Sequence, residues 1–371
     1  MRYLFPILFL LVGAAVAYTA VRLWHILPLV KGWKWALTAL YVLCFLLMLP
    51  YFKFEKSIPV GLGAVMYELW TSWLIAFLYI LLIFIVLDLG RLVHLVPSGF
   101  VKDSAAGTAT VLGIVTILLV YGGFHYHHKY REELVINTEK QIEKPLRIVL
   151  VSDIHAGYHN RARELGRWVD LINAEHPDLV LIAGDLVDGH MKPVLEWHYD
   201  TVFRKIEAPV YACLGNHEYI GGEEEARAFL KSAGITLLKD QVALTRGIRI
   251  VGRDDLYNPC RAALWELFEA DSTFTIILDH QPYNLEQAKE AGADFQFSGH
   301  THHGQVWPGN WITDALFEKA FGRYRKGNTL YYISSGLGIW GGKFRIGTRS
   351  EYVVLQLTAS RNASHPSIMS W

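Results

Sequence analysis

The 371-residue chain has little cysteine and no excess of charge of either sign. Its three cysteines suggest no disulfide framework and no cysteine-ligated zinc site, which fits a reducing compartment. Lysine plus arginine equals aspartate plus glutamate, at 35 each, so no basic field favours a nucleic-acid partner. Internal repeats, low-complexity tracts and an initial twin-arginine pair are also lacking. The informative features of the sequence are therefore its apolar runs and the polar motifs between them.

Charged residues are nearly absent from four long apolar stretches in the first third of the chain. These stretches are Tyr3–Val21, Trp35–Leu49, Leu69–Leu87 and Ala105–Phe124. About 20 apolar residues suffice for one membrane-crossing helix, and the second stretch reaches that only if it extends past Pro50 to Phe52. Tryptophan and tyrosine cluster near the ends, as interfacial aromatic residues do. We therefore expect a transmembrane region of four helices over residues 1–128.

Three features bear on the processing, role and orientation of this region. Ala15-Val-Ala17 resembles a signal-peptide cleavage site, but the three later stretches favour a retained first helix. No stretch has a central run of ionisable residues, which argues against a transporter. The basic residues nearest the four stretches divide evenly between the two sides, and adding Lys140 and Lys144 favours a cytoplasmic C-terminal region. The expected location is a multi-pass position in the cell membrane.

Five short polar motifs occupy the rest of the chain. They are Asp153-Ile-His155, Gly184-Asp185-Leu-Val-Asp188, Gly215-Asn216-His217-Glu218, the lone His280, and Gly299-His300-Thr-His302. Each follows a short apolar run typical of a buried strand, and sites in α/β sheets lie at such strand ends. Taken singly, an Asp-x-His or a Gly-Asn-His is usually a surface turn. All five in this order are very unlikely to occur by chance.

The apolar runs predict most of the regular structure. The expected strands are Leu146–Ser152, Leu179–Ala183, Val210–Leu214, Thr275–Leu278, Phe295–Phe297 and a closing Tyr352–Leu357. The expected helices are Ala162–Glu175, Gly222–Ala233 and Leu285–Ala291. Thr236–Leu244 and Gly247–Gly252 are expected to form a strand pair.

This ordered set resembles the calcineurin-like metallophosphoesterase superfamily, and within it the membrane-associated branch that includes transmembrane proteins with a metallophosphoesterase domain. The resemblance implies an α/β fold, a four-layer α/β/β/α sandwich over residues 146–358. The polar residues 129–145 are expected to form a linker, and 359–371 a tail. It implies two divalent metal ions, with Asp185 as the bridging ligand. One ion would be held by Asp153, His155 and His302, and the other by Asn216, His280 and His300. His217 would be the general acid, oriented by Asp188.

Nitrogen and oxygen ligands of this kind suit Mn, Fe, Zn, Co or Ni. The implied reaction is hydrolysis of a phosphodiester or pyrophosphate by attack of a metal-bound hydroxide. The leading expectation is a lipid-borne substrate, and a UDP-acylglucosamine is one candidate. Membrane lipids are expected as further partners. The alternatives are a tethered hydrolase of soluble nucleotides or phosphoesters, and a non-catalytic membrane sensor or scaffold.

The segment after the last motif bears on the substrate. His303 stands where the branch often has glycine. Apolar residues from Trp307 to Phe321 precede Arg323, Arg325 and Lys326. This pattern suits a membrane surface or a lipid phosphate, and it equally suits an amphipathic helix packed on the domain.

Overall fold

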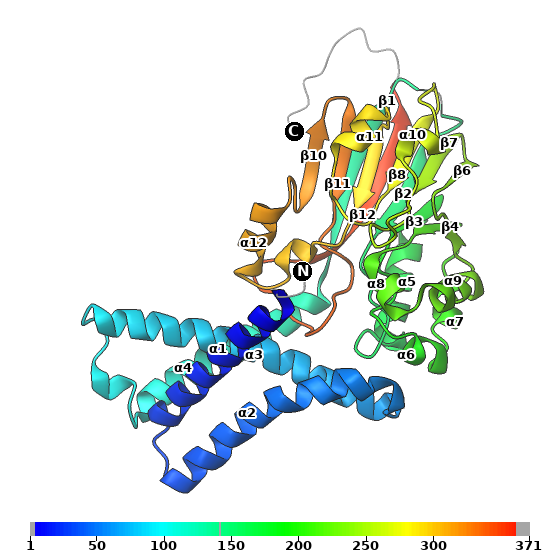
Figure 1. Ribbon diagram of the computed structural model, residues 1–371. Coiled ribbons are helices and arrows are strands. Elements are labelled where there is room, and N and C mark those ends of the chain that lie inside the picture. Colours follow the sequence, from blue (N-terminus) through cyan, green and yellow to red (C-terminus); the bar gives the residue numbers. More distant parts are fainter. Residues whose placement is uncertain (1–3, 141, 361–371) are drawn as a thin grey trace. The chain divides into compact units, whose positions relative to one another are not determined.

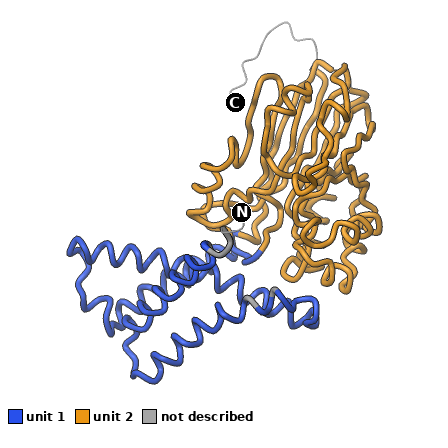
Figure 2. The backbone as a smooth tube through the Cα atoms, viewed as in Figure 1, with its two compact units in different colours: residues 1–125, 341–344 blue, residues 126–340, 345–371 orange. Residues whose placement is uncertain are grey.

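A computed structural model of the chain describes residues 4–140 and 142–360. The chain divides into two compact units (Figure 2). Unit 1 contains residues 1–125 and 341–344, and unit 2 contains residues 126–340 and 345–371.

Four long helices make up most of unit 1 (Figure 1). They are α1 (Leu4–Ile26), α2 (Lys31–Phe54), α3 (Val60–Leu92) and α4 (Ala105–His127), with short 3-10 turns η1 (Glu55–Ser57) and η2 (Ser98–Phe100). All four are long and apolar enough to cross a membrane, which confirms the prediction of four such helices. Helix α2 continues through Pro50. A helix in a membrane can tolerate the loss of the one backbone hydrogen bond that proline removes.

Apolar side chains and one polar cluster join these helices. Val16, Phe45 and Phe77 bring α1, α2 and α3 into a small common core. The Tyr18 hydroxyl donates to Asp88 over 2.6 Å, and Arg22 forms an ion pair with the same carboxylate. Pairing of this kind lowers the free energy of placing charged groups in or near a bilayer.

Two six-stranded sheets form the centre of unit 2. The first sheet, in the order β1-β12-β2-β3-β4-β5, contains β1 (Lys129–Thr138), β12 (Ser350–Ala359), β2 (Leu146–Val151), β3 (Leu179–Ala183), β4 (Val210–Cys213) and β5 (Thr236–Leu237). The second sheet, in the order β10-β11-β9-β8-β7-β6, contains β10 (Gly322–Lys326), β11 (Thr329–Ile333), β9 (Phe295–Ser298), β8 (Phe274–Leu278), β7 (Ile248–Gly252) and β6 (Gln241–Thr245).

Helices cover the outer face of each sheet. Helices α5 (Ala162–Ala174), α7 (Asp200–Phe203) and α9 (Glu223–Ser232) pack on the first sheet, and α10 (Leu264–Leu267) and α11 (Glu286–Glu290) pack on the second. Alternate residues of β2, such as Ile148 and Leu150, face strands of the second sheet such as β8 across a shared core. The predicted four-layer α/β/β/α sandwich is therefore confirmed. The remaining short helices are α6 (Lys192–Glu196), α8 (Asn216–Gly221), η3 (His302–Gly304) and α12 (Gly309–Leu316).

The first part of the expected linker, residues 129–138, is instead strand β1. It runs parallel to β12, from the pair Lys129 and Ser350 to the pair Thr138 and Ala359. Its many polar residues hide a half-buried strand, since only Leu134, Ile136 and Thr138 are buried, at every second position. Strand β12 consequently lies inside the sheet and does not close it.

A second difference concerns the segment Thr236–Leu244, expected to be one strand. It is divided between β5 in the first sheet and β6 in the second, and only β6 pairs antiparallel with β7. The expected tail was residues 359–371, but Ala359 is the last residue of β12, and the part from Arg361 onward lies outside the described residues.

The shared core between the sheets should dominate the stability of unit 2. Leu150 is fully buried there, whereas Leu244 on β6 is 72% exposed. We expect Leu150→Ala to lower the free energy of unfolding by about 2–5 kcal/mol through lost burial and a residual cavity. Leu244→Ala should change it by no more than about 0.5 kcal/mol. Denaturant unfolding of the full chain in detergent measures both, and equal shifts would contradict the assigned core.

Candidate metal centre

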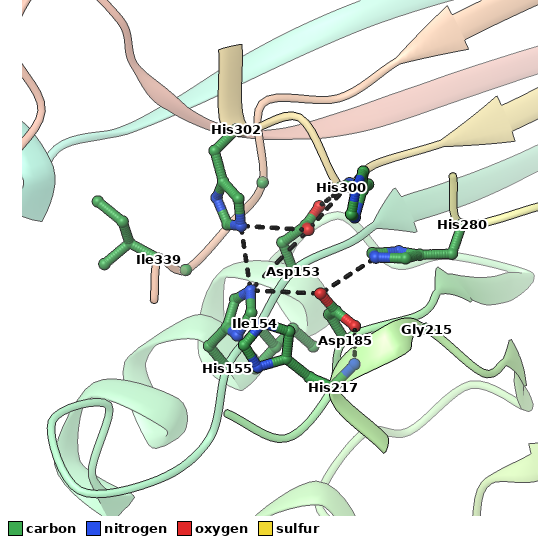
Figure 3. Close-up of polar contacts among 12 residues, drawn as sticks. Asp153, Ile154, His155, Asp185, Gly215, His217, His280, His300, His302 and Ile339 are labelled. Atoms are coloured by element: carbon green, nitrogen blue, oxygen red, sulfur yellow. Dashed lines mark hydrogen bonds and ion pairs between the residues drawn. The ribbon is translucent and has the colours of Figure 1, made fainter. Parts of the chain in front are cut away.

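Strand ends of both sheets bring the motif residues together. Asp153 and His155 follow β2, Asp185 follows β3, Asn216 and His217 begin α8 after β4, His280 follows β8, and His300 and His302 follow β9. Carboxyl ends of neighbouring parallel strands meet at one edge of a sheet. Here two such edges face each other, and Figure 3 shows the side chains converging from both.

The first group contains Asp153, His155 and His302, all buried. Their donor atoms lie within 4.8 Å of one another. The Nε2 atoms of the two histidines are 3.1 Å apart, and Nε2 of His302 lies 3.4 Å from Oδ1 of Asp153. This is the set expected from the sequence for one metal ion.

The second group contains Asp185, His280 and His300, again within 4.8 Å. Nε2 of His280 lies 3.0 Å from Oδ2 of Asp185. Oδ1 of Asn216 is 2.9 Å from Nδ1 of His300, so the expected amide ligand is also in place. All seven residues expected to bind metal therefore lie in two adjoining groups.

Asp185 connects the two groups. Its Oδ2 atom, which is close to His280, is also 3.7 Å from Nε2 of His155 in the first group. Figure 3 shows both contacts as dashed lines that meet at one oxygen. Burial opposes ionisation of Asp185, but the nearby His280, His217 and His155 outweigh it and hold the pKa of this carboxyl well below its usual value. A bridging ligand needs this ionised form.

Hydrogen bonds identify which histidine nitrogens are available. Nδ1 of His280 is 2.8 Å from the carbonyl oxygen of Ala183, and a carbonyl can only accept, so the proton is on Nδ1. Nε2 of His280 is then the nitrogen that faces Oδ2 of Asp185, and it is buried without a hydrogen-bond partner. A buried polar atom in that state is unfavourable unless a ligand binds it. A cation between His280 and Asp185 fits both groups.

The backbone at this centre is strained. Asp153, His155, Asp185, His300 and His302 have φ values of 52°, 48°, 51°, 70° and 47°. Residues other than glycine rarely adopt such angles, and they persist where the surroundings enforce them, often at functional sites. The surroundings must therefore include specific supports for these loops.

Glu218 supplies one support, for the loops that follow β3 and β4. Its carboxylate accepts backbone N–H groups of Asp185 and Val187, each over 3.0 Å, and of Gly215 over 2.7 Å. Burial and the negative charge of Asp185 raise the pKa of Glu218 to about 7, although these hydrogen bonds favour its ionised form. The sequence marked Glu218 only as the end of its motif.

Two further supports escaped the sequence analysis. The buried Asn160 donates its amide to the carbonyl oxygens of Ile154 and His155, each over 3.0 Å. The buried Arg345 donates to the carbonyl oxygen of His302 over 2.7 Å and to that of Ser335 over 2.5 Å. Both lie in irregular loops, where no periodic pattern points to a buried polar residue. Proximity to the first motif is the only signal that could have indicated Asn160.

His217 lies at the open side of the centre and is half-buried. Its Nδ1 is 2.8 Å from the backbone carbonyl of Asp188, so Nδ1 holds a proton and Nε2 remains for proton exchange. Burial would lower the pKa of His217, but the charges of Asp185 and Asp188 outweigh this and raise it. The Asp188 carboxylate lies closer to Nδ1 of His155, at 3.1 Å, than to Nδ1 of His217, at 4.0 Å.

Comparisons with known proteins agree on one family. The model for the calcineurin-like phosphoesterase family matches residues 146–304. A Campylobacter jejuni protein described as an uncharacterized metallophosphoesterase is 30% identical over 259 residues, covering 67% of this chain and 69% of that protein. A Helicobacter pylori protein described in the same words is 32% identical, covering 60% of this chain and 62% of that protein.

A zebrafish (Danio rerio) transmembrane protein with metallophosphoesterase domain is 29% identical, covering 66% of this chain and 61% of that protein. Among solved structures, the 5'-nucleotidase precursor of Thermus thermophilus gives a TM-score of 0.37 at 16% identity, covering 57% of this chain and 55% of that one. The chain thus spans about three fifths of the length of several relatives.

The glycine before Asn216 should be essential to this geometry. A Cβ atom at Gly215 would lie 2.2 Å from Oδ1 of Asp185, whereas one at Gly166 in α5 would have no atom within 4 Å. We expect Gly215→Ala to displace the carboxylate and reduce the Mn²⁺ that the full chain retains after dialysis. Gly166→Ala should bind as the parent does and be equally or slightly more stable. Parent-like Mn²⁺ retention by Gly215→Ala would show that the loop can relax.

Proposed function

Because the chain belongs to the calcineurin-like phosphoesterase family, we propose that it is a membrane-anchored, binuclear metal-dependent phosphoesterase. The observation that carries this proposal is the position of Asp185. One of its oxygens lies 3.0 Å from His280 and 3.7 Å from His155, within reach of both ligand groups. Two cations can approach closely only if an anion lies between them, and this ionised carboxylate is suitably placed.

The remaining ligands divide as their distances suggest. Asp153, His155 and His302 would hold one cation, while Asn216, His280 and His300 would hold the other. Such a set of imidazole, carboxylate and amide donors accepts Mn, Fe, Zn, Co or Ni. When bound, two such ions supply a nucleophile at neutral pH and neutralise charge on the attacking and leaving oxygens.

His217 provides the proton for the leaving oxygen. Its raised pKa favours the protonated ring, and its partly exposed position lets it meet a substrate. The Asp188 backbone carbonyl fixes the ring orientation, and the two nearby carboxylates stabilise the imidazolium. Asp188 also orients His155, and so it serves a ligand and the acid together.

The proposed substrate is a phosphodiester or pyrophosphate carried by a lipid. Four helices fit to cross a membrane would keep the enzyme at the surface where such a substrate resides. We place these helices in the cell membrane, with unit 2 on the cytoplasmic side. A tethered enzyme for soluble phosphoesters remains the competing proposal, and assays with lipid and soluble substrates side by side separate the two.

The bridging role can be tested by counting metal ions. Asp185→Asn removes the anion between the two sites, so we expect fewer than two equivalents of metal and no turnover. The matched control is Asp170→Asn, which changes an exposed carboxylate on α5. Metal analysis of the purified full chain gives the result. Two equivalents in an active Asp185→Asn protein would refute the bridge, and two metals in a parent that hydrolyses no phosphoester would favour a non-catalytic sensor.

The acid role can be tested through the leaving group and the pH. His217→Gln should keep both metals but slow turnover by about 10²–10⁴-fold. The loss should be smaller for p-nitrophenyl esters, whose leaving group needs little protonation. Because the required form of His217 is protonated, the parent should lose activity as pH rises through its raised pKa, and His217→Gln should lack that limb.

His198→Gln, which changes an exposed histidine, is the control and should match the parent at every pH. An equal loss for all leaving groups would assign His217 an electrostatic or positioning role.

A further inference from the structure

Helix α12 directs its large apolar side chains outward. Trp311 is 63% exposed, Ile312 59% and Leu316 68%, and no residue within the helix is buried. These three residues are called the α12 ridge below. The expected alternative, in which such a helix packs on the domain through its apolar face, therefore does not hold. An exposed apolar group of this kind commonly marks an interaction surface.

The same helix is fastened to the loop that carries His300 and His302. Gly304 has φ +70°, and a Cβ atom there would lie 2.0 Å from the backbone of Gly309, so the start of α12 packs backbone to backbone on η3. Beyond its end, the Thr301 hydroxyl donates to the carbonyl oxygen of Ala320 over 2.6 Å. The α12 ridge thus stands on the loop that holds two candidate metal ligands.

Aromatic rings connect the helix to the metal centre. Phe317, directly after α12, has its ring 6.1 Å from that of His300 and 4.7 Å from that of Tyr283, which is 41% exposed. His303, the departure from the usual glycine, is half-buried, with its ring 4.7 Å from Phe321 and its Nε2 3.5 Å from Asp314 of α12. The apolar surface therefore extends from the α12 ridge to the edge of the metal centre.

We propose that the α12 ridge docks in the interface of a lipid bilayer and so presents the metal centre to phosphoesters at the membrane surface. Tryptophan and aliphatic side chains together favour the boundary between headgroups and acyl chains. The chain also brings unit 2 to a bilayer, since α4 ends at His127 and β1 begins at Lys129, with one residue between them. The presentation of the metal centre to phosphoesters rests on the proposed function, whereas the docking of the ridge does not.

Charge near the ridge is complementary to anionic lipid. Residues 307–326 contain four basic and two acidic side chains. Arg323 and Arg325 are exposed on β10, which follows α12. Basic residues near a bilayer are attracted to anionic headgroups over about one Debye length.

A fluorescent probe on the ridge tests docking without reference to catalysis. In a full-length Cys44→Ser/Cys260→Ser background, Trp311→Cys is labelled with an environment-sensitive dye. The matched control is Trp265→Cys, because Trp265 is 73% exposed and belongs to α10, a helix that lies well apart from α12 in Figure 1. Each protein is placed in phosphatidylethanolamine–phosphatidylglycerol nanodiscs with shallow spin-labelled lipid or with aqueous iodide.

We expect the label at position 311 to be quenched more by the lipid quencher, and less by iodide, than the label at position 265. Equal quenching of the two labels by both agents would overturn the proposal. Protection of position 311 from iodide without lipid quenching would also overturn it, by placing a protein on the ridge.

Turnover supplies a second readout. Trp311→Ser/Leu316→Ser should lower kcat/KM for a long-chain phosphodiester in nanodiscs at least about tenfold, because apolar burial is lost, while Trp265→Ser should not. An unchanged value would overturn the presentation of substrate by the ridge. If the parent hydrolyses no phosphoester at all, the proposed function fails, and the quenching result still decides the docking.

Discussion

The Asp185 carboxylate is the point at which buried side chains of both ligand groups converge. Nε2 of His280 and Nε2 of His155 both face one of its oxygens, and Nε2 of His155 also faces Nε2 of His302. Nδ1 of His280 bonds to a backbone carbonyl, so its Nε2 is the atom that shares a proton or a cation with the carboxylate. Buried polar atoms this close together are unfavourable unless a proton or a cation lies between them, so the fold must enforce the arrangement.

The two sheets and a few buried polar residues provide that enforcement. The strand ends set the approximate positions of the ligands, and the core between the sheets holds the strands rigid. The loops are then secured individually, by Glu218 between the loops after β3 and β4 and by Arg345 beneath His302. These hydrogen bonds offset the strain of the positive φ angles. Each strained residue costs on the order of 1–3 kcal/mol.

The features predicted correctly from the sequence are those that depend on residues close together along the chain. Short apolar runs predicted β2, β3 and β4, and the motifs after them predicted the ligands that the structure brings together. Strand β1 was missed because its polar residues form a strand only by pairing with β12. The paired residues, such as Lys129 and Ser350, are about 220 positions apart. Arg345 was missed because its role exists only where the loops meet. The division of Thr236–Leu244 between two sheets is likewise a property of the packed molecule.

The loop after β9 connects the metal centre to the α12 ridge. Residues 299–309 carry His300 and His302, and at Gly309 they begin the helix whose large apolar residues face outward. In a freely diffusing protein such a surface would promote aggregation. In a chain tied to membrane helices, the bilayer offers the same surface a favourable partner. Because one short stretch of backbone positions both the ligands and the α12 ridge, docking of the ridge would set the height of the metal centre above the lipid. The distance between the reacting phosphate and the membrane would then be a specificity element in its own right.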